Sequence, residues 1–100
     1  MLYADNRPYV VPESLDELTG PTSGVVELPV MLDWSPRRSY DLDDPRQLCL
    51  LYEQVMCEAA NVADLRTYLN GAILRAVWSS LFLPRQVHTL WLTRFPDLLR

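Results

Sequence analysis

The sequence contains no lysine, one histidine and three glycines among its 100 residues. A catalytic triad or a histidine-based metal site needs partners around the lone histidine, His88, that this chain scarcely offers. The sequence also lacks a glycine-rich phosphate loop, a Gly-x-Ser-x-Gly motif and a Cys-x-x-Cys pair. We therefore expect a protein that is not an enzyme and has no catalytic residues, no metal site and no cofactor.

Long apolar runs are missing as well. A helix that crosses a bilayer needs roughly 18 apolar residues, and Arg75 and the pair Ser79-Ser80 interrupt the most apolar stretch. The first seven residues show no basic region followed by an apolar one, so they predict no secretory signal. Cys49 and Cys57 would lie about 12 Å apart on one helix, too far for a disulfide. We expect a cytoplasmic protein with reduced cysteines and no membrane contact.

Acidic and basic residues are divided unevenly along the chain. Residues 1–44 carry nine acids and three arginines, a net charge of −6, whereas residues 45–100 carry four acids and six arginines, a net charge of +2; together they give the chain's −4. This division suggests that the acidic part meets a basic surface, either on this molecule or on a partner. The simpler alternative is that these charges only keep the surface solvated.

Prolines dominate the first third of the sequence. They exclude a long helix there and favour extended and turn conformations: Pro8, Pro12, Pro21, Pro29 and Pro36. Residues 13–19 could form a short helix, since a proline precedes them and Gly20-Pro21 ends them. Residues 25–34 are apolar and β-branched enough for a strand, although the proline inside favours an edge position or a break. The partner strand would come from residues 8–11 or from another chain.

Helical patterns begin after residue 41. Asp43-Asp44-Pro45 is a strong helix start, because a carboxylate can cap free amides and proline suits the first helical position. Apolar residues then recur at helical spacing and predict one buried face: Leu48, Leu51, Tyr52, Val55, Met56 and Ala59. Asn61 can cap the next helix. Asn70-Gly71 predicts two short helices in succession, with one kinked helix as the alternative.

Leu83-Pro84 opens a final helix that Phe95-Pro96 closes, and Val87, Leu90 and Trp91 form its apolar stripe. The sequence therefore predicts a mainly α, one-domain fold. Its helical body, residues 41–100, is a compact bundle of three to four helices. Residues 1–40 form a proline-rich, extended acidic arm, laid across the bundle or reaching outward, which could add a short helix and a short β-strand or hairpin.

The segment Trp34–Tyr40 is the most suggestive candidate for binding a partner. It places two arginines between two aromatic residues, and tryptophan, tyrosine and arginine dominate the energetics of protein interfaces. The predicted partner-binding residues are Trp34, Arg37, Arg38 and Tyr40. The same segment could hold phosphates or a nucleic-acid strand. The alternative, which the sequence leaves open, is a linker whose two aromatic side chains pack into the helical core.

Other reactive residue types have simpler interpretations. His88 lies beside the apolar stripe of the last helix, so we interpret it as a packing residue. Cys49 follows several acids, which would raise the pKa of its thiol and make it a poor nucleophile. The acids Asp41, Asp43 and Asp44 lack the glycine and the closing glutamate of a calcium loop, and helix capping explains them.

A DNA-binding helix-turn-helix is the alternative function. Residues 63–69 would form its first helix, Asn70-Gly71 its turn, and residues 72–81 its reading helix. That helix would expose Arg75, Ser79 and Ser80, which is little for reading bases in an acidic chain. A small transcriptional regulator with a divergent helix-turn-helix therefore ranks second.

Four stretches resemble small, uncharacterised bacterial proteins that are associated with nucleotidyltransferase-like toxins of the abortive-infection type: Leu28–Ser35, Asp41–Pro45, Tyr68–Gly71, and Leu83–Arg85 with Arg94–Pro96. The resemblance covers residues 28–98 and implies an antitoxin or accessory role. We therefore expect a non-enzymatic, antitoxin-like binding protein that engages a protein partner, such as a toxin, through its N-terminal arm. Nucleic acid is the second choice of partner, and a homodimer is also open.

Overall fold

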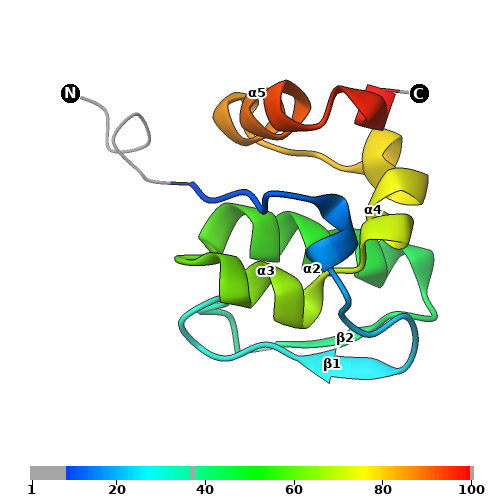
Figure 1. The fold of residues 1–100 in the computed structure, drawn as a ribbon. Coiled ribbons are helices and arrows are strands. Elements are labelled where there is room, and N and C mark those ends of the chain that lie inside the picture. Colours follow the sequence, from blue (N-terminus) through cyan, green and yellow to red (C-terminus); the bar gives the residue numbers. More distant parts are fainter. Residues whose placement is uncertain (1–8, 37, 100) are drawn as a thin grey trace.

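The computed structural model describes residues 9–36 and 38–99, and most of the elements within them are helices (Figure 1). The mainly α prediction is confirmed. The α-helices are α2 (Pro45–Glu58), α3 (Val62–Tyr68), α4 (Gly71–Val77) and α5 (Arg85–Arg94). Short 3₁₀ helices are η1 (Leu15–Glu17), η2 (Trp78–Ser80) and η3 (Pro96–Leu99), and the strands are β1 (Val25–Glu27) and β2 (Ser39–Asp41).

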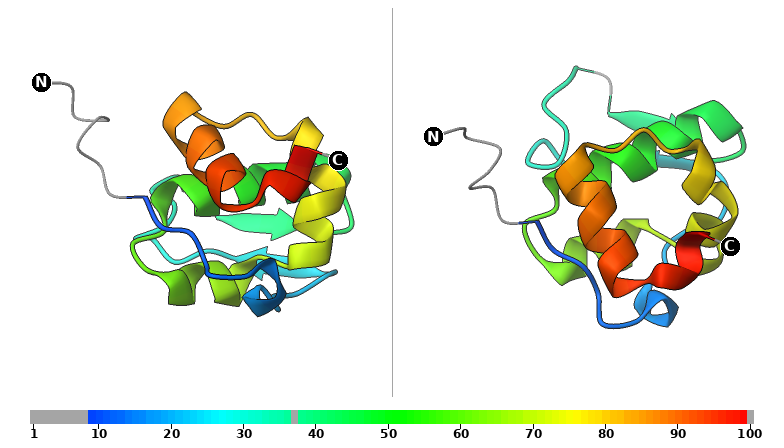
Figure 2. Two further views of the ribbon diagram at one scale, coloured as in Figure 1. Left: turned by 45° about the horizontal axis from the view of Figure 1, so that its top comes forward. Right: turned by 90° about the horizontal axis from the view of Figure 1, so that it is seen from above.

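The elements lie at three levels in Figure 1, with the small sheet at the bottom, α2 and α3 in the middle and α5 at the top. Helix α4 rises along one side and joins the middle level to the upper one. The first described residues run between α5 and α3, as both views in Figure 2 show. Within the described part of the chain, no helix is both long and apolar enough to cross a membrane.

The predicted helix starts are confirmed by their caps. Asp44 accepts a hydrogen bond from the backbone N–H of Arg46 at 3.0 Å, and Pro45 occupies the first position of α2. Asn61 caps α3 in the same way, and the Asn70 side chain accepts from the N–H of Ile73 at 3.2 Å at the start of α4. The second helical run is therefore two short helices, because a capped start interrupts it at Asn70.

The last helix lies between the two prolines that were predicted to flank it. Pro84 directly precedes α5, and the N–H of Phe95 donates to the carbonyl of Trp91 where the helix ends, just before Pro96. Val87 and Trp91 are fully buried. The apolar stripe of α5 therefore covers the upper side of the core.

The prediction of which segment pairs with the first strand is wrong. Strand β1 pairs antiparallel with β2, and Val26 lies opposite Tyr40. The partner strand therefore comes from this chain, and residues 9–11 form no strand. Instead, Gly24 adopts a positive φ of 84° before β1, where glycine is favoured, and a loop returns the chain to β2. The strand ends at Glu27 because Pro29 has no N–H to donate and begins a turn.

The described part of the predicted arm lies across the helices and contributes to their core. Its buried leucines, each at most 3% exposed, are Leu15, Leu18, Leu28 and Leu32. Two backbone hydrogen bonds fasten it to the turn between α3 and α4: the N–H of Gly20 donates to Leu69 at 2.8 Å, and that of Gly71 donates to Leu18 at 2.9 Å. Residues 9–36 therefore share one hydrophobic core with the helical body.

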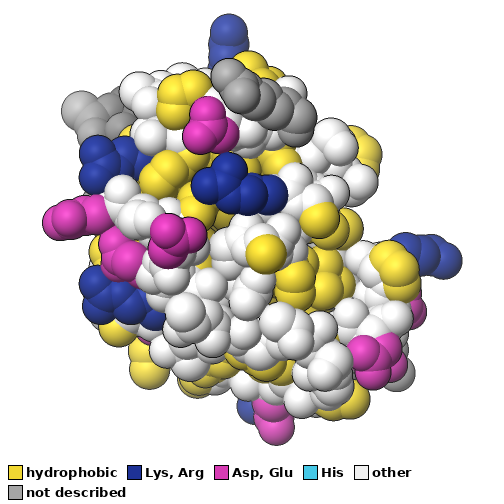
Figure 3. All heavy atoms as spheres, turned by 45° about the vertical axis from the view of Figure 1, so that its right-hand side comes forward, with side chains coloured by type: hydrophobic (Ala, Val, Ile, Leu, Met, Phe, Trp, Pro, Cys, Tyr) yellow, Lys and Arg dark blue, Asp and Glu magenta, His cyan; other side chains and the backbone are white. Residues whose placement is uncertain are grey.

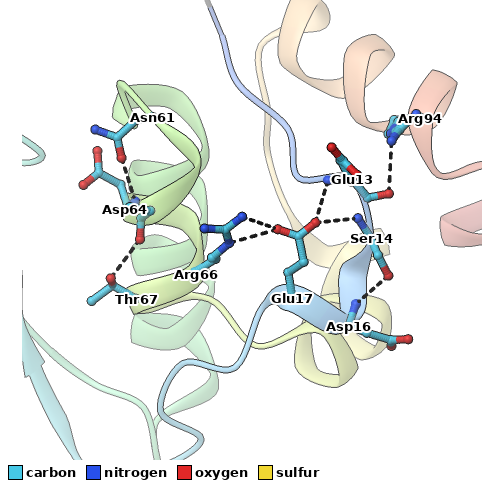
Figure 4. A network of polar contacts seen from close by, with 10 residues as sticks. Glu13, Ser14, Asp16, Glu17, Asn61, Asp64, Arg66, Thr67 and Arg94 are labelled. Carbon is cyan, nitrogen blue, oxygen red and sulfur yellow. Dashed lines mark hydrogen bonds and ion pairs between the residues drawn. The ribbon is translucent and has the colours of Figure 1, made fainter.

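A polar network holds η1 between two helices (Figure 4). Glu17 accepts hydrogen bonds from the backbone N–H groups of Glu13 and Ser14, at 2.9 and 3.0 Å. Its other carboxylate oxygen pairs with Arg66 of α3 at 2.9 Å. Arg94 of α5 donates to the carbonyl of Glu13 at 3.2 Å. Helices α3 and α5 are thus both attached to the same short segment.

Gly71 sits where a side chain has no room. A Cβ atom built on it would lie 2.2 Å from the carbonyl oxygen of Leu15, so the backbone of η1 would have to move. We expect Gly71→Ala to lower the free energy of unfolding by about 1–3 kcal/mol, the usual cost of overpacking. Ala72→Ser is the control, because it adds one atom at the next position of the same helix, where the side chain is exposed. Equal stability of Gly71→Ala and the natural protein in urea would contradict the tight contact.

Glu17 should make the stability depend on pH. Arg66 donates to this carboxylate and lowers its pKa below the ordinary 4.5, although burial acts in the opposite direction. A group whose folded-state pKa is lowered stabilises the fold above its unfolded-state pKa, and this stabilisation disappears as the pH falls through the folded-state value. Glu17→Gln should therefore be less stable than the natural protein at pH 7, with a difference that shrinks below pH 4.5. Urea unfolding at several pH values measures it, and a difference independent of pH would contradict it.

Candidate functional site

The loop between β1 and β2 is closed at its base by three polar contacts. The N–H of Leu28 donates to the carbonyl of Arg38 at 2.8 Å. The Nε of Arg38 donates back to the carbonyl of Leu28 at 3.1 Å. The same guanidinium lies 3.6 Å from the carboxylate of Glu27. Arg38 therefore ties the two sides of the loop together.

A buried carboxylate organises the inside of the loop. Asp33 is only 4% exposed and accepts hydrogen bonds from the Tyr40 hydroxyl at 2.5 Å and from the N–H of Ser35 at 3.0 Å. Burial acts to raise the pKa of Asp33, but the hydrogen bonds from Tyr40 and Ser35 outweigh it and lower that pKa. Burial and the bond to Asp33 raise the pKa of Tyr40 to about 12. At neutral pH the pair is thus a phenol that donates to a carboxylate.

The middle of the loop is fixed to helix α2. The N–H groups of Leu32 and Asp33 both donate to the carbonyl of Pro29, at 2.9 and 3.1 Å, which forms a tight turn. The side-chain amide of Gln54 on α2 donates to the carbonyl of Leu32 at 2.7 Å. Since the Leu32 side chain is also buried in the core, the turn cannot move freely away from the helix.

Three large apolar side chains project from this loop into solvent. Val30 is 55% exposed, Met31 is 72% exposed and Trp34 is 83% exposed. We call these three residues the loop tip. Large exposed apolar groups that lie close together usually mark a surface that another molecule covers, and tryptophan is the residue type most enriched at such contacts.

The structure separates the residues that the sequence grouped as partner-binding. Trp34 lies at the loop tip, whereas Arg38 and Tyr40 turn toward the base of the loop, where they hold Leu28 and Asp33. Arg37 lies outside the described residues. Tyr40 is partly buried against the core, whereas Trp34 is exposed. The alternative in which both aromatic side chains pack into the core is therefore right for Tyr40 and wrong for Trp34.

Sequence reasoning missed Val30 and Met31. They belong to residues 25–34, whose apolar, β-branched composition predicts a strand with alternate side chains buried. Pro29 instead starts a turn, which buries Leu32 and leaves Val30 and Met31 in solvent. The signal that could have found them is the proline itself, because a run broken at that point cannot bury all its apolar side chains.

The other reactive residues form no evident site. His88 is exposed and stacks on the ring of Trp78, with ring centroids 5.1 Å apart. Burial and the charge of Glu53 raise the pKa of the Cys49 thiol. Asp41 accepts from the N–H of Asp43 and so shapes the turn before α2. Throughout residues 9–36 and 38–99, no three histidine, cysteine or acidic side chains gather as metal ligands would.

The helix-turn-helix alternative can be compared with α3 and α4. Two residues, Leu69 and Asn70, separate these helices, whereas the DNA-binding motif uses a turn of about 3–4. Helix α4 packs against η1, and Arg75 is its exposed basic residue. On the side of the molecule where α4 lies, basic side chains are scattered among acidic ones (Figure 3). DNA readers instead gather basic residues on one face, so this alternative has little support and remains a prediction.

The Asp33–Tyr40 pair should stabilise the loop. Tyr40→Phe removes a donor from a buried carboxylate, so we expect it to lower the free energy of unfolding by about 1–3 kcal/mol. If the two side chains act through each other, Asp33→Asn combined with Tyr40→Phe should cost less than the sum of the single changes. Urea unfolding of all four proteins of this cycle measures the coupling. Strictly additive losses would show that the hydrogen bond contributes nothing.

Comparisons with known proteins do not assign this chain to a family. No protein-family model matches the chain, and neither curated proteins nor solved structures gave a match. The resemblance to toxin-associated bacterial proteins therefore remains a prediction, and the functional argument depends on the loop.

Proposed function

We propose that this protein is a non-enzymatic binding protein that engages a protein partner through the loop tip of Val30, Met31 and Trp34. The observation that supports the proposal most is that Trp34 is 83% exposed and Met31, three residues earlier on the same loop, is 72% exposed. These side chains bury little surface within the chain. Burying them in a complementary apolar pocket of a partner would therefore stabilise the complex.

The construction of the loop favours binding at low entropic cost. Arg38 joins the two sides of the loop at its base, Asp33 accepts hydrogen bonds inside the loop, and Gln54 on α2 donates to the carbonyl of Leu32 in the middle of the loop. A loop that is already held in one shape loses little conformational freedom when a partner covers it. The contacts that fix the loop are polar and partly buried, whereas the side chains it presents are apolar and exposed, as an interface requires.

The charge of the first forty-four residues supports a basic partner. Glu13, Asp16 and Glu27 are exposed acids in the same part of the chain as the loop tip, and this part carries a net charge of −6. A nucleotidyltransferase-like toxin, the partner that the sequence resemblance implies, needs a basic cleft for its nucleotide. We propose an antitoxin-like role in which the loop tip enters an apolar pocket and the acids face that basic surface.

The loop tip can be tested without disturbing the fold. Met31→Ser combined with Trp34→Ser should abolish co-purification with the product of the adjacent gene, because it removes the exposed apolar groups. Circular dichroism should remain that of the natural protein, since neither side chain is buried. The matched control is Val25→Ser on β1, an apolar residue that is 70% exposed and lies outside the loop tip; it should leave co-purification intact.

Two results would contradict the proposal. Undiminished co-purification of the double variant would show that the loop tip does not bind this partner. Equal loss in the Val25→Ser control would show that the effect is a general one of surface polarity. Binding through the acidic residues should also weaken as salt is raised, because exposed charges are screened over about 8 Å at physiological ionic strength.

A further inference from the structure

A second exposed apolar surface lies on the outward face of α2. Phe82, which follows η2, is 88% exposed, and Leu50 on α2 is 54% exposed. Together with Cys49 they line an open groove of about 470 Å³, whose margins include Arg46 and Glu53. The N–H of Phe82 donates to the carboxylate of Glu53 at 2.9 Å, which holds the phenylalanine beside the helix. This surface, the α2 groove, shares no residue with the loop tip.

The order of residues along α2 makes the groove complementary to itself. Arg46, Leu50 and Glu53 follow one another at spacings of four and three, so they lie along one side of the helix. The basic residue is at one end of this row and the acidic residue at the other, with the apolar residue between them. In an antiparallel pair of such helices, each end of the row meets the opposite charge.

We infer that the α2 groove binds a second copy of this chain and forms a two-fold symmetric dimer. With the symmetry axis between Cys49 and Leu50, Arg46 of one copy lies opposite Glu53 of the other, because both are equally far from the axis. Leu50 then lies opposite Cys49. A two-fold axis repeats each of these contacts, and the assembly closes at two copies.

Phe82 completes the contact. Its ring projects beside the groove, and the two-fold axis brings the ring of each copy to the groove of the other. A phenylalanine side chain buries about 150–250 Å², so two rings and two leucines form an apolar centre with charged pairs at its edges, as in ordinary interfaces. A partner of uniform charge would face either Arg46 or Glu53 with a like charge, which favours a second copy as the occupant.

The molar mass in solution tests the inference. Sedimentation equilibrium of the natural protein should show a reversible doubling of the 11.6 kDa chain mass as the concentration rises. Leu50→Arg and Phe82→Ser should each stay at the mass of one chain while keeping the circular dichroism of the folded protein, since both side chains are exposed. The loop-tip double variant, Met31→Ser with Trp34→Ser, is the control and should still form dimers.

A charge exchange tests the antiparallel arrangement itself. Arg46→Glu and Glu53→Arg should each weaken the dimer about tenfold, because each places like charges opposite one another twice. Glu53→Arg also removes the hydrogen bond from the N–H of Phe82, so the matched comparison for the double variant is Glu53→Arg, which has lost the same bond. The double variant restores opposite charges and should dimerise more tightly than Glu53→Arg, a recovery that two merely structural roles would not produce. A single-chain mass at all concentrations, a dimer that persists in Leu50→Arg and Phe82→Ser, or a double variant no tighter than Glu53→Arg would each overturn the inference.

Discussion

Two backbone hydrogen bonds, between Gly20 and Leu69 and between Gly71 and Leu18, join the first part of the chain to the helices. They bring η1 against α4 so closely that no side chain fits at Gly71. In this position Leu15 and Leu18 are buried in the core, and Arg66 pairs with Glu17. The acidic segment is thus held as part of the folded body, which fixes where its charges lie.

The loop between the strands reverses the usual distribution of side chains. It buries a carboxylate, Asp33, and exposes a tryptophan, Trp34, in adjacent positions. Both features lower the stability of the fold. A buried carboxylate must be compensated by hydrogen bonds, and an exposed indole ring makes no stabilising contact with the core. Tyr40 and Ser35 provide the compensation. These bonds offset the burial of the carboxylate, whereas Trp34 remains 83% exposed.

Local signals in the sequence predict local structure well. The caps at Asp44, Asn61 and Asn70 give the starts of α2, α3 and α4, since each depends on neighbouring residues alone. Strand β2 could not be predicted, because it depends on which distant residues the loop brings opposite β1. For Tyr40 the sequence left two alternatives open, binding a partner or packing into the core. Of the candidate site, composition indicated Trp34, whereas its exposed apolar neighbours became evident only from the turn after Pro29.

The hydrogen bond from Arg94 to Glu13 joins residues that are 81 positions apart. Contacts of such long sequence separation form slowly, because a large loop of chain must close before they stabilise anything. During synthesis, η1 and the residues beside it leave the ribosome well before α3, α4 and α5, the helices that this segment packs against or bonds to in the folded protein. Leu15 and Leu18 are exposed to solvent until these helices have been made. The folded protein buries both leucines, so the growing chain is most prone to aggregate at that stage.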